Sequence, residues 1–522
     1  MDTVNNKWLI ALSVILPTFI EIVDTTIVTV SLDHIRGTFS AGVDEVTWTL
    51  TSYLVSNAII IPMTGWLSRL IGRKNYLILS ITVFTVSSFL CGIAWSLGSL
   101  IFFRVVQGIG GGGLQPLSQA ILLESFPQKQ HGTAMAVFGI GILFGPIIGP
   151  LLGGWISDNW AWQWIFFINI PIGIISIIMN LIFIKDPPYV QKTKMKIDYW
   201  GLILLTVGLG TLQLVIEKGQ REDWFSSSFI LWFFIIAVVS LILFVIVELF
   251  SEHPVVNLRI FRDPSFSAGT VVMFFAFFNL MSSIVMLPLY LQTLMGYTAT
   301  LAGMVIGLGG IVTVFVMPIV GPLVSKTDPR YPLAFGIVVS ALAAYSIAHL
   351  TLYSDFQAIL MTRMLLGVGM GSLMIPLMTI SMSHIKKEEM GNAAGINNLL
   401  RNVGGSMGIA FASTMLVSRS QVRQFQLVEH LSPFDINYQM ASHKLSQALV
   451  YKGYIGDYIS QRASDGIIYA QVLRQAAMLS FNDVAYVTFI IMLCILPLVF
   501  ILKKGGTNST NRKSEQQNLD IH

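Results

Sequence analysis

Two acidic side chains interrupt the first long apolar run of the chain. Glu21 and Asp24 lie three residues apart between Trp8 and Leu32, so a helix would place both on one face. Ionisable groups inside apolar segments of this kind are costly and usually functional. Asp24, near the middle of the run, could gain and lose a proton as its surroundings change, or could simply pair with a structural arginine. Glu21 could share that proton, bind a cationic molecule together with Asp24, or face water nearer the end of the run.

A permanently charged side chain lies in a second apolar run. Arg104 cannot give up its charge, so it needs either water or a partner of opposite charge. We expect Arg104 to tune how firmly a carboxylate holds its proton, and Asp24 is one candidate for that carboxylate. Gln107, one turn further on, could form hydrogen bonds across helices.

The second half of the chain contains another polar cluster in an apolar context. Its members are Asn397, Asn398, Arg401 and Asn402, and Arg363 precedes them. Helical spacing places Asn398, Arg401 and Asn402 on one face. That face could line a central cavity or could bind a neighbouring helix. We therefore treat Gln107, Asn398, Arg401 and Asn402 as candidate substrate-cavity residues.

The segment "RVVQGIGGGGLQP" contains the spacing G-x-G-x-x-G at Gly108, Gly110 and Gly113. A dinucleotide-binding turn has this spacing, but it must follow a strand and open a helix in a soluble unit. Here the glycines lie inside an apolar run long enough to cross a membrane. We therefore interpret them as positions where helices approach closely.

The composition excludes a soluble protein. The 522 residues are 54% hydrophobic and only 11% charged, and the mean hydropathy is +0.72. A soluble chain would carry about a quarter of charged residues. The net charge of +4 is modest and gives no reason to expect a nucleic-acid partner. The partner that the composition does predict is the lipid bilayer, around an all-α protein.

Fourteen apolar segments of membrane-spanning length follow one another, and we number them as spans 1 to 14. Their centres lie near residues 20, 58, 86, 110, 145, 174, 207, 239, 277, 312, 341, 368, 407 and 491. The first run lacks the small-residue cleavage site of a signal peptide, so we interpret it as a span. With the N-terminus in the cytoplasm, 19 of the 31 Lys and Arg residues fall in cytoplasmic segments. We expect both termini in the cytoplasm and the polar segment 419–480 outside.

Two segments eight spans apart resemble each other. "RVVQGIGGGGLQPL" and "RMLLGVGMGSLMIPL" share an arginine, three glycines and a leucine at matching offsets. The matching pairs are Arg104/Arg363, Gly108/Gly367, Gly110/Gly369, Gly112/Gly371 and Leu114/Leu373. An internal duplication explains this agreement. We expect a six-helix half at 1–190, two inserted helices at 191–262, a second six-helix half at 263–505 that includes 419–480, and a cytoplasmic tail at 506–522.

Two further motifs could take part in movement. "GILFGPIIGPLLGG" contains Gly145, Pro146 and Gly149, which could form either a static kink or a moving seam between the halves. "GWLSRLIGRKN" makes a tight basic turn with Gly65, Gly72 and Arg73.

That basic turn anchors the topology through its positive charges, which also include Arg69 and Lys74. It could in addition form a gating contact. We therefore count Gly65, Gly72, Arg73 and Gly108 with the candidate conformational residues.

Taken together, these motifs resemble the major facilitator superfamily. "RVVQGIGGGG" is similar to its fourth-helix motif, and "GILFGPIIGPLLGG" to its antiporter motif, with Pro150 where the last glycine is usual. "VDTTIVTVSL" resembles the first-helix signature of the fourteen-helix drug/proton antiporters. "LQLVIEKGQREDWFSS" looks like the EmrB type in particular. "GWLSRLIGRKN" resembles the inner-loop motif, but Arg69 stands where an acidic residue is usual.

The resemblance implies a proton-coupled antiporter that exports lipophilic or cationic toxic small molecules by alternating access, with Asp24 and Arg104 in the proton relay. It implies no bound cofactor, because the proton gradient supplies the energy. It also implies a bacterial inner-membrane location and a periplasmic adaptor with an outer-membrane channel, of the EmrA/TolC kind, for which segment 419–480 would be the dock. One alternative is an exporter of one endogenous compound, such as a lipid, siderophore or metabolite. The alternative for segment 419–480 is a passive cap over the outer vestibule. The sequence contains no H-E-x-x-H motif, no glycine-rich phosphate loop in a soluble context and no sizeable soluble domain, so a transporter is expected rather than an enzyme.

Overall fold

The computed structural model describes residues 3–127, 130–185, 198–429, 431–432, 434–451 and 457–502. These residues form helices and connecting turns, with no strand among them. The first helix group is α1 (Thr3–Phe39), α2 (Val43–Ile71), α3 (Arg73–Gly92), α4 (Leu97–Gly111), α5 (Leu114–Ser125), α6 (His131–Asn159), α7 (Trp164–Phe167) and α8 (Asn169–Phe183). A helix pair, α9 (Tyr199–Lys218) and α10 (Ser228–Phe250), follows. The second helix group is α11 (Pro264–Leu289), α12 (Ala299–Lys326), α13 (Arg330–Ile347), α14 (Phe356–Met382), α15 (Met390–Val428), α16 (Ile436–Tyr451), α17 (Asp457–Ile495) and α18 (Leu498–Ile501).

Polar side chains at the ends of the apolar runs fix where several helices begin. Asp198, Asp263, Thr298 and Asp355 each stand immediately before a helix, and each side chain accepts a hydrogen bond from a backbone N–H of the first turn. Such a cap satisfies one of the backbone donors that the first turn leaves free. The short polar stretches between the apolar runs therefore set the boundaries of the helices.

Thirteen helical segments of the described chain are long and apolar enough to cross a membrane. They agree with thirteen of the fourteen predicted spans. The predicted span near residue 407 is the long helix α15, which does not meet the same standard of apolarity because of its polar residues. α15 nevertheless packs among α2, α5, α9, α11 and α17. Its polar residues thus contact other helices, which explains how a weakly apolar segment lies inside the bundle.

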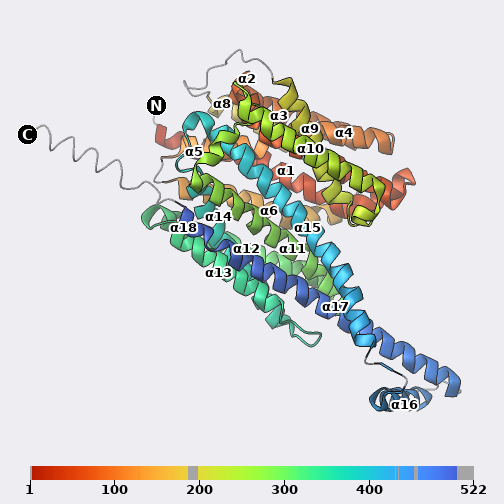
Figure 1. Ribbon diagram of the computed structural model, residues 1–522. Coiled ribbons are helices and arrows are strands. Elements are labelled where there is room, and N and C mark those ends of the chain that lie inside the picture. The colour runs from red at the N-terminus through yellow and green to blue at the C-terminus, as the bar shows by residue number, and fades with distance from the viewer. Residues whose placement is uncertain are drawn as a thin grey trace, which may run out of the picture.

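The start of α1 and the short α18 lie on one side of the bundle, at the left of Figure 1. We call this the termini side and the opposite side the far side. The two helix groups lie one above the other in this view, and α9 and α10 lie with the first group. The ends of α15 and α17 project from the bundle on the far side and carry α16 at their tip (Figure 1).

The helix pair α9–α10 contacts both helix groups. α10 packs on α9, and α9 packs on α2 of the first group and α15 of the second. On the far side, Lys218 Nζ donates to Thr47 Oγ1 at 3.1 Å, and Gln213 Nε2 donates to Ser406 Oγ at 2.9 Å. The outer surface of α10 exposes large apolar side chains such as Trp232. That surface suits contact with lipid.

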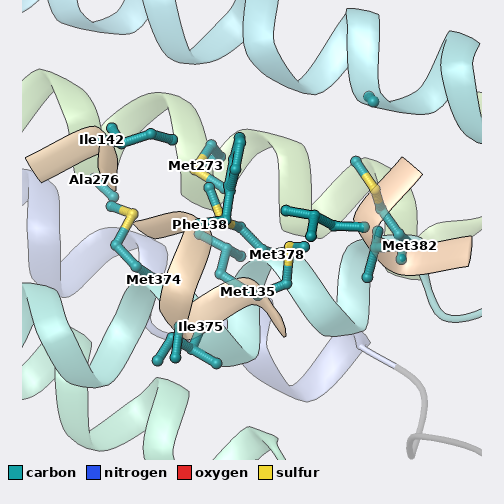
Figure 2. Packing of buried hydrophobic residues seen from close by; sticks show 14 of the residues in the cluster. Met135, Phe138, Ile142, Met273, Ala276, Met374, Ile375, Met378 and Met382 are labelled. Atoms are coloured by element: carbon teal, nitrogen blue, oxygen red, sulfur yellow. The ribbon is translucent and has the colours of Figure 1, made fainter. Parts of the chain in front are cut away.

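A buried apolar cluster joins the two groups on the termini side. Met135 and Phe138 of α6 meet Met273 of α11 and Met374 and Met378 of α14, as Figure 2 shows. Methionine is unbranched and flexible, so it fits irregular gaps and repacks with little penalty. An interface with this composition is suited to separating and closing again.

Candidate functional site

Asp24 lies completely buried among helices of the first group. Its Oδ2 accepts a hydrogen bond from Arg104 Nη1 at 2.6 Å, which forms an ion pair. Its Oδ1 accepts from Gln107 Nε2 at 2.9 Å and from Asn169 Nδ2 at 2.6 Å. Three donors on two oxygens fit an ionised carboxylate. Asp24, the carboxylate that the sequence offered as a candidate partner for Arg104, is therefore the one that Arg104 contacts.

Three contacts besides the ion pair with Asp24 hold the Arg104 side chain in place. Its Nε donates to the backbone oxygen of Thr49 at 3.0 Å, and its guanidinium lies 4.2 Å from the centre of the Tyr53 ring. Its Nη1 also donates to Gln107 Oε1 at 2.7 Å. The planar fork thus touches α1, α2 and its own helix α4 at once, a geometry that a lysine ammonium would not reproduce.

Glu21 belongs to a neighbouring site with a different character. Tyr53 Oη donates to Glu21 Oε1 at 3.1 Å, Asn57 Nδ2 donates to the same oxygen at 3.2 Å, and Gln115 Nε2 donates to Oε2 at 2.5 Å. Glu21 is only 3% exposed, so the hypothesis that it faces water is wrong for this conformation. None of the described basic side chains forms an ion pair with it.

Tyr53 links the two carboxyl groups. Its ring stacks on the Arg104 guanidinium and its hydroxyl binds Glu21. A change in the charge of either carboxyl group would therefore alter the electrostatic environment of the other, because Tyr53 contacts both Glu21 and the Arg104 partner of Asp24. The site consists of one carboxylate held by a cation and one carboxyl held by neutral donors.

A proton that binds Asp24 must displace the Arg104 ion pair. A buried charge left without its partner costs about 3–5 kcal/mol, so protonation of Asp24 in this closed environment requires the helices around it to move. This arrangement can link proton binding to a change of conformation, because the ion pair and the protonated carboxyl need different surroundings.

Glycines bring the helices of this site close enough for these contacts. A Cβ on Gly108 of α4 would lie 2.6 Å from the carbonyl oxygen of Tyr53, and it would also collide with Ser56 Oγ. Larger side chains at Gly108 would push α4 away from α2 and separate Arg104 from Tyr53. The glycine-rich segment is thus a close helix contact, as predicted, in a chain region without a strand.

The two glycines of the antiporter-like motif face the first helix group rather than the seam between the halves. Gly145 packs directly on Ile22, and Gly149 on Thr26, so this face of α6 holds α1 within the first group. The seam with the second group is formed by other residues of α6, because Gly139 faces Met317 of α12. Gly145 and Gly149 therefore position the helix that carries Glu21 and Asp24. Pro146 lies inside the continuous helix α6.

The polar cluster of α15 divides between two environments. Asn398 Nδ2 donates to Gln119 Oε1 of α5 at 2.8 Å, which joins the two helix groups directly. Arg401 is buried and lies 5.2 Å from the centre of the Phe277 ring, while its Nη1 has no partner among the described residues. Asn402 is half-buried. Gln107, proposed from the sequence as a cavity residue, is fully buried and belongs to the Asp24 cluster.

The basic turn between α2 and α3 lies at the contact between the helix groups. A Cβ on Gly65 would be 2.7 Å from the backbone of Asn392, so α2 and α15 touch at this point. Gly72 has a φ of 94°, which favours glycine, and lets α2 turn directly into α3. Arg73 forms an ion pair with Glu124 at the end of α5.

Arg69 takes part in the same contact through an ion pair. Its Nη1 lies 3.7 Å from Glu389 Oε1, in the short helix η5 (Lys387–Glu389) that leads into α15. Arg69 stands where an acidic residue is usual, and an acidic residue, Glu389, lies opposite it across the interface. This ion pair joins the two helix groups.

We expect Arg69→Glu to weaken the contact on the termini side, because it places two acids opposite each other. The pair is partly exposed, so the expected coupling energy is about 0.2–1 kcal/mol. The double variant Arg69→Glu with Glu389→Arg should recover the wild-type rate of transport, whereas each single variant should not. Equal rates in the double variant and in Arg69→Glu alone would contradict a direct interaction.

Several residues of the site were not foreseen from the sequence. Tyr53, Asn57, Gln115 and Asn169 all bind one of the two carboxyl groups. Each is an uncharged polar residue inside an apolar run. Their only signal was the spacing of Tyr53 and Asn57, which lie one helical turn apart and so share a face.

All described direct polar and glycine contacts between the two helix groups lie in the termini-side half of the bundle. They include Gly65 with Asn392, Arg69 with Glu389, and Gln119 with Asn398. A helical bundle of two groups, closed at one side and carrying charged side chains at its centre, defines a multi-pass membrane transporter.

Comparison with known proteins gives the family. The model of the Major Facilitator Superfamily matches residues 14–409. The chain belongs to this superfamily, and the family predicted from the sequence motifs is confirmed.

Relatives and a solved structure agree with this assignment. The chain is 35% identical to the multidrug export protein EmrB of Escherichia coli K12, over 95% of this chain and 94% of that protein. It is 34% identical to the fatty acid resistance protein FarB of Neisseria gonorrhoeae, over 95% and 96%. The human organic anion transporter MFSD10 (TETRAN) has a similar fold, with a TM-score of 0.58 over 93% of this chain and 99% of that chain, at 12% identity. This last similarity concerns the fold alone.

Proposed function

We propose that the protein is a proton-coupled antiporter that exports lipophilic or cationic toxic small molecules. The observation that carries this proposal is the buried Asp24–Arg104 ion pair at the centre of the first helix group. Asp24 acts as the coupling residue, because it can exchange Arg104 for a proton only when the surrounding helices move. Glu21, linked through Tyr53, is the second proton or cation site.

The arrangement of the contacts supports alternating access. Residues 1–190 and 263–505 act as the two moving halves, and 191–262 form the inserted helix pair. The direct contacts that close the termini side must separate when the transporter opens to that side. These contacts are glycine approaches, methionines, the Gln119–Asn398 hydrogen bond and one partly exposed ion pair. Each is individually weak, so the interface can separate and form again with a small change in free energy.

The names of the relatives support export of harmful amphiphilic compounds. One relative is a multidrug export protein, and another confers resistance to fatty acids. An exporter of one endogenous lipid, siderophore or metabolite is the alternative. In this proposal the proton gradient supplies the energy and no cofactor takes part. The proposed location is the bacterial inner membrane, with the termini side in the cytoplasm.

The function can be tested in cells that express the protein and are loaded with a fluorescent lipophilic cation. We expect efflux that depends on the pH gradient and stops when an uncoupler collapses it. Gradient-dependent efflux of one endogenous compound, with no movement of several unrelated lipophilic dyes, would instead support the alternative.

The projecting end of the second helix group is the proposed dock for a periplasmic adaptor protein. Arg423 forms two hydrogen bonds with Asp483, at 2.7 and 2.9 Å, and these hold α15 against α17. Near the tip, the Tyr438 phenol donates to Asp465 at 2.8 Å, and this hydrogen bond raises the pKa of Tyr438. Two apolar side chains of this projection, Phe425 and Ile436, are both 69% exposed. A rigid support with exposed apolar residues suits a protein partner.

We expect the double variant Phe425→Ala with Ile436→Ala to lose association with an adaptor protein, because both side chains offer exposed apolar surface. Co-purification with a co-expressed adaptor measures the association. Phe250→Ala, on the termini side, is the matched control and should co-purify as the wild type does. Export by the double variant in proteoliposomes, where no adaptor is needed, should be unchanged. Undiminished co-purification of the double variant would contradict the docking role.

A further inference from the structure

The second copy of the repeated motif contains a buried arginine that has no acidic partner. Arg363 of α14 corresponds to Arg104 of α4 and is 5% exposed. Its Nη1 donates to Ser283 Oγ of α11 at 3.1 Å. Among the described residues, no carboxylate forms an ion pair with Arg363. Its Nε has no hydrogen-bond partner there either.

Ser283 stands where the repeat would place the carboxylate. The separation between Ser283 and Arg363 is 80 residues, which is the same as that between Asp24 and Arg104. Each arginine donates through Nη1 to the residue at this position. The second helix group has therefore kept the geometry of the contact and has exchanged the carboxylate for a hydroxyl.

The space around Ser283 is not filled by side chains. A cavity of about 20 Å³, measured as the space open to the centre of a water molecule, lies between α11, α13 and α17. Its polar lining residues are Asn279, Ser282, Ser283 and Thr488. Ile347, which also lines the cavity, takes the place of Ser88 when Arg363 is aligned with Arg104. The cavity thus occupies the place that corresponds to the Asp24 cluster.

The cavity has a polar side in a lining that is otherwise apolar, and the positive charge of Arg363 lies behind Ser283, to which it donates. Asn279 is 2% exposed, and its Nδ2 has no partner among the residues that the structure describes. The Ser283 hydroxyl accepts from Arg363 and can itself donate, whereas the hydroxyls of Ser282 and Thr488 donate to Met286 Sδ at 3.7 Å and to the backbone oxygen of Val484 at 2.8 Å and must rotate to reach an anion. A buried guanidinium without a counter-charge is strongly unfavourable. A space of this size is sufficient for one water-sized particle.

We propose that this cavity binds a small monovalent anion of the size of chloride. The anion accepts hydrogen bonds from Asn279 and the surrounding hydroxyls. Its charge replaces, beside Arg363, the carboxylate that Asp24 provides beside Arg104. The first helix group carries a built-in negative charge, whereas the second takes its negative charge from solution.

The test measures the melting temperature of the purified full-length protein in chloride, bromide or gluconate at constant ionic strength. We expect chloride and bromide to raise the melting temperature in a saturable manner, because a ligand that binds the folded state stabilises it by mass action. Gluconate, which is too large for the cavity, should have no effect. Equal melting temperatures in all three salts would show that the cavity holds water only and would overturn the proposal.

Two variants test whether the effect of chloride on the melting temperature arises at this cavity. Ser283→Asp places a carboxylate beside Arg363, so it should remove the response to chloride, while Ser418→Asp, an acid added at an exposed position of α15, should keep it. Asn279→Leu removes one donor and should raise the chloride concentration of half-effect by about tenfold or more. A response that is unchanged in Ser283→Asp or in Asn279→Leu would place the anion elsewhere and contradict the assignment.

Discussion

Replacement of Asp24 by asparagine is expected to abolish uphill export. Asparagine preserves the size of the side chain and can still accept from Gln107 and Asn169, but it cannot bind and release a proton. In proteoliposomes with an imposed pH gradient, we expect export of a lipophilic cation to fall to the level of empty vesicles. Binding of the same compound to the purified protein should remain measurable, because the amide leaves the fold of the site in place.

Asp24→Asn also leaves the Arg104 charge without a partner, which lowers the stability of the protein. A second substitution at Arg104 controls for this loss of stability. An unpartnered buried guanidinium destabilises the protein by about 3–5 kcal/mol, so Asp24→Asn should melt at a lower temperature. Adding Arg104→Gln removes the orphaned charge and should restore part of the stability, but not the export. Uphill export by Asp24→Asn at more than half the wild-type rate would show that the coupling proton binds elsewhere, with Glu21 as the next candidate.

Replacement of Gly65 by alanine is expected to open the termini side. The added Cβ would lie 2.7 Å from the backbone of Asn392, and neither backbone can yield without moving a helix. Overpacking of this kind costs about 1–3 kcal/mol, which shifts a two-state equilibrium about 5- to 150-fold. The closed termini side should therefore become the minor state, and the rate of export should fall in proportion.

Distances between spin labels measure this shift. Ser40 and Tyr353 are exposed on the far side, one in each helix group, and can carry the labels in a protein without Cys91 and Cys494. We expect the distance between the labels to shorten in Gly65→Ala as the far side closes. Gly154→Ala is the matched control, because a Cβ on Gly154 meets nothing within 4 Å. An unchanged distance distribution in Gly65→Ala would contradict the role of this contact as a gate.

The sequence alone was sufficient to predict the bundle of membrane-spanning helices and the two charged side chains at the centre of the site. Long apolar runs predict helices that cross a membrane, since every backbone polar group must be satisfied within the segment. Asp24 and Arg104 could be singled out because charged residues in such runs are rare. Their pairing could only be a hypothesis, because the contact joins two helices whose orientation about their own axes depends on tertiary packing.

The neutral members of the site show where sequence reasoning reaches its limit. Asn57 and Gln115 bind Glu21, yet an amide in an apolar run can equally well hold two helices together. The glycines of α6 could be recognised as sites of close approach, but not assigned to α1 rather than to the second helix group. The pairing of Arg69 with Glu389 depends on the packing of α15 beside α2, and the sequence does not show which helices pack together.

The exchange of a proton for the substrate is the central claim, and proton release from the purified protein tests it most directly. A pH-sensitive dye in weakly buffered solution reports protons that appear when a lipophilic cation is added. At a pH low enough for the wild-type protein to hold a proton on Asp24 with the Arg104 ion pair broken, we predict that substrate binding releases protons in an amount that saturates with the substrate, and that Asp24→Asn releases none although it binds. Substrate binding to the wild-type protein without any proton release would contradict the claim that Asp24 couples the two.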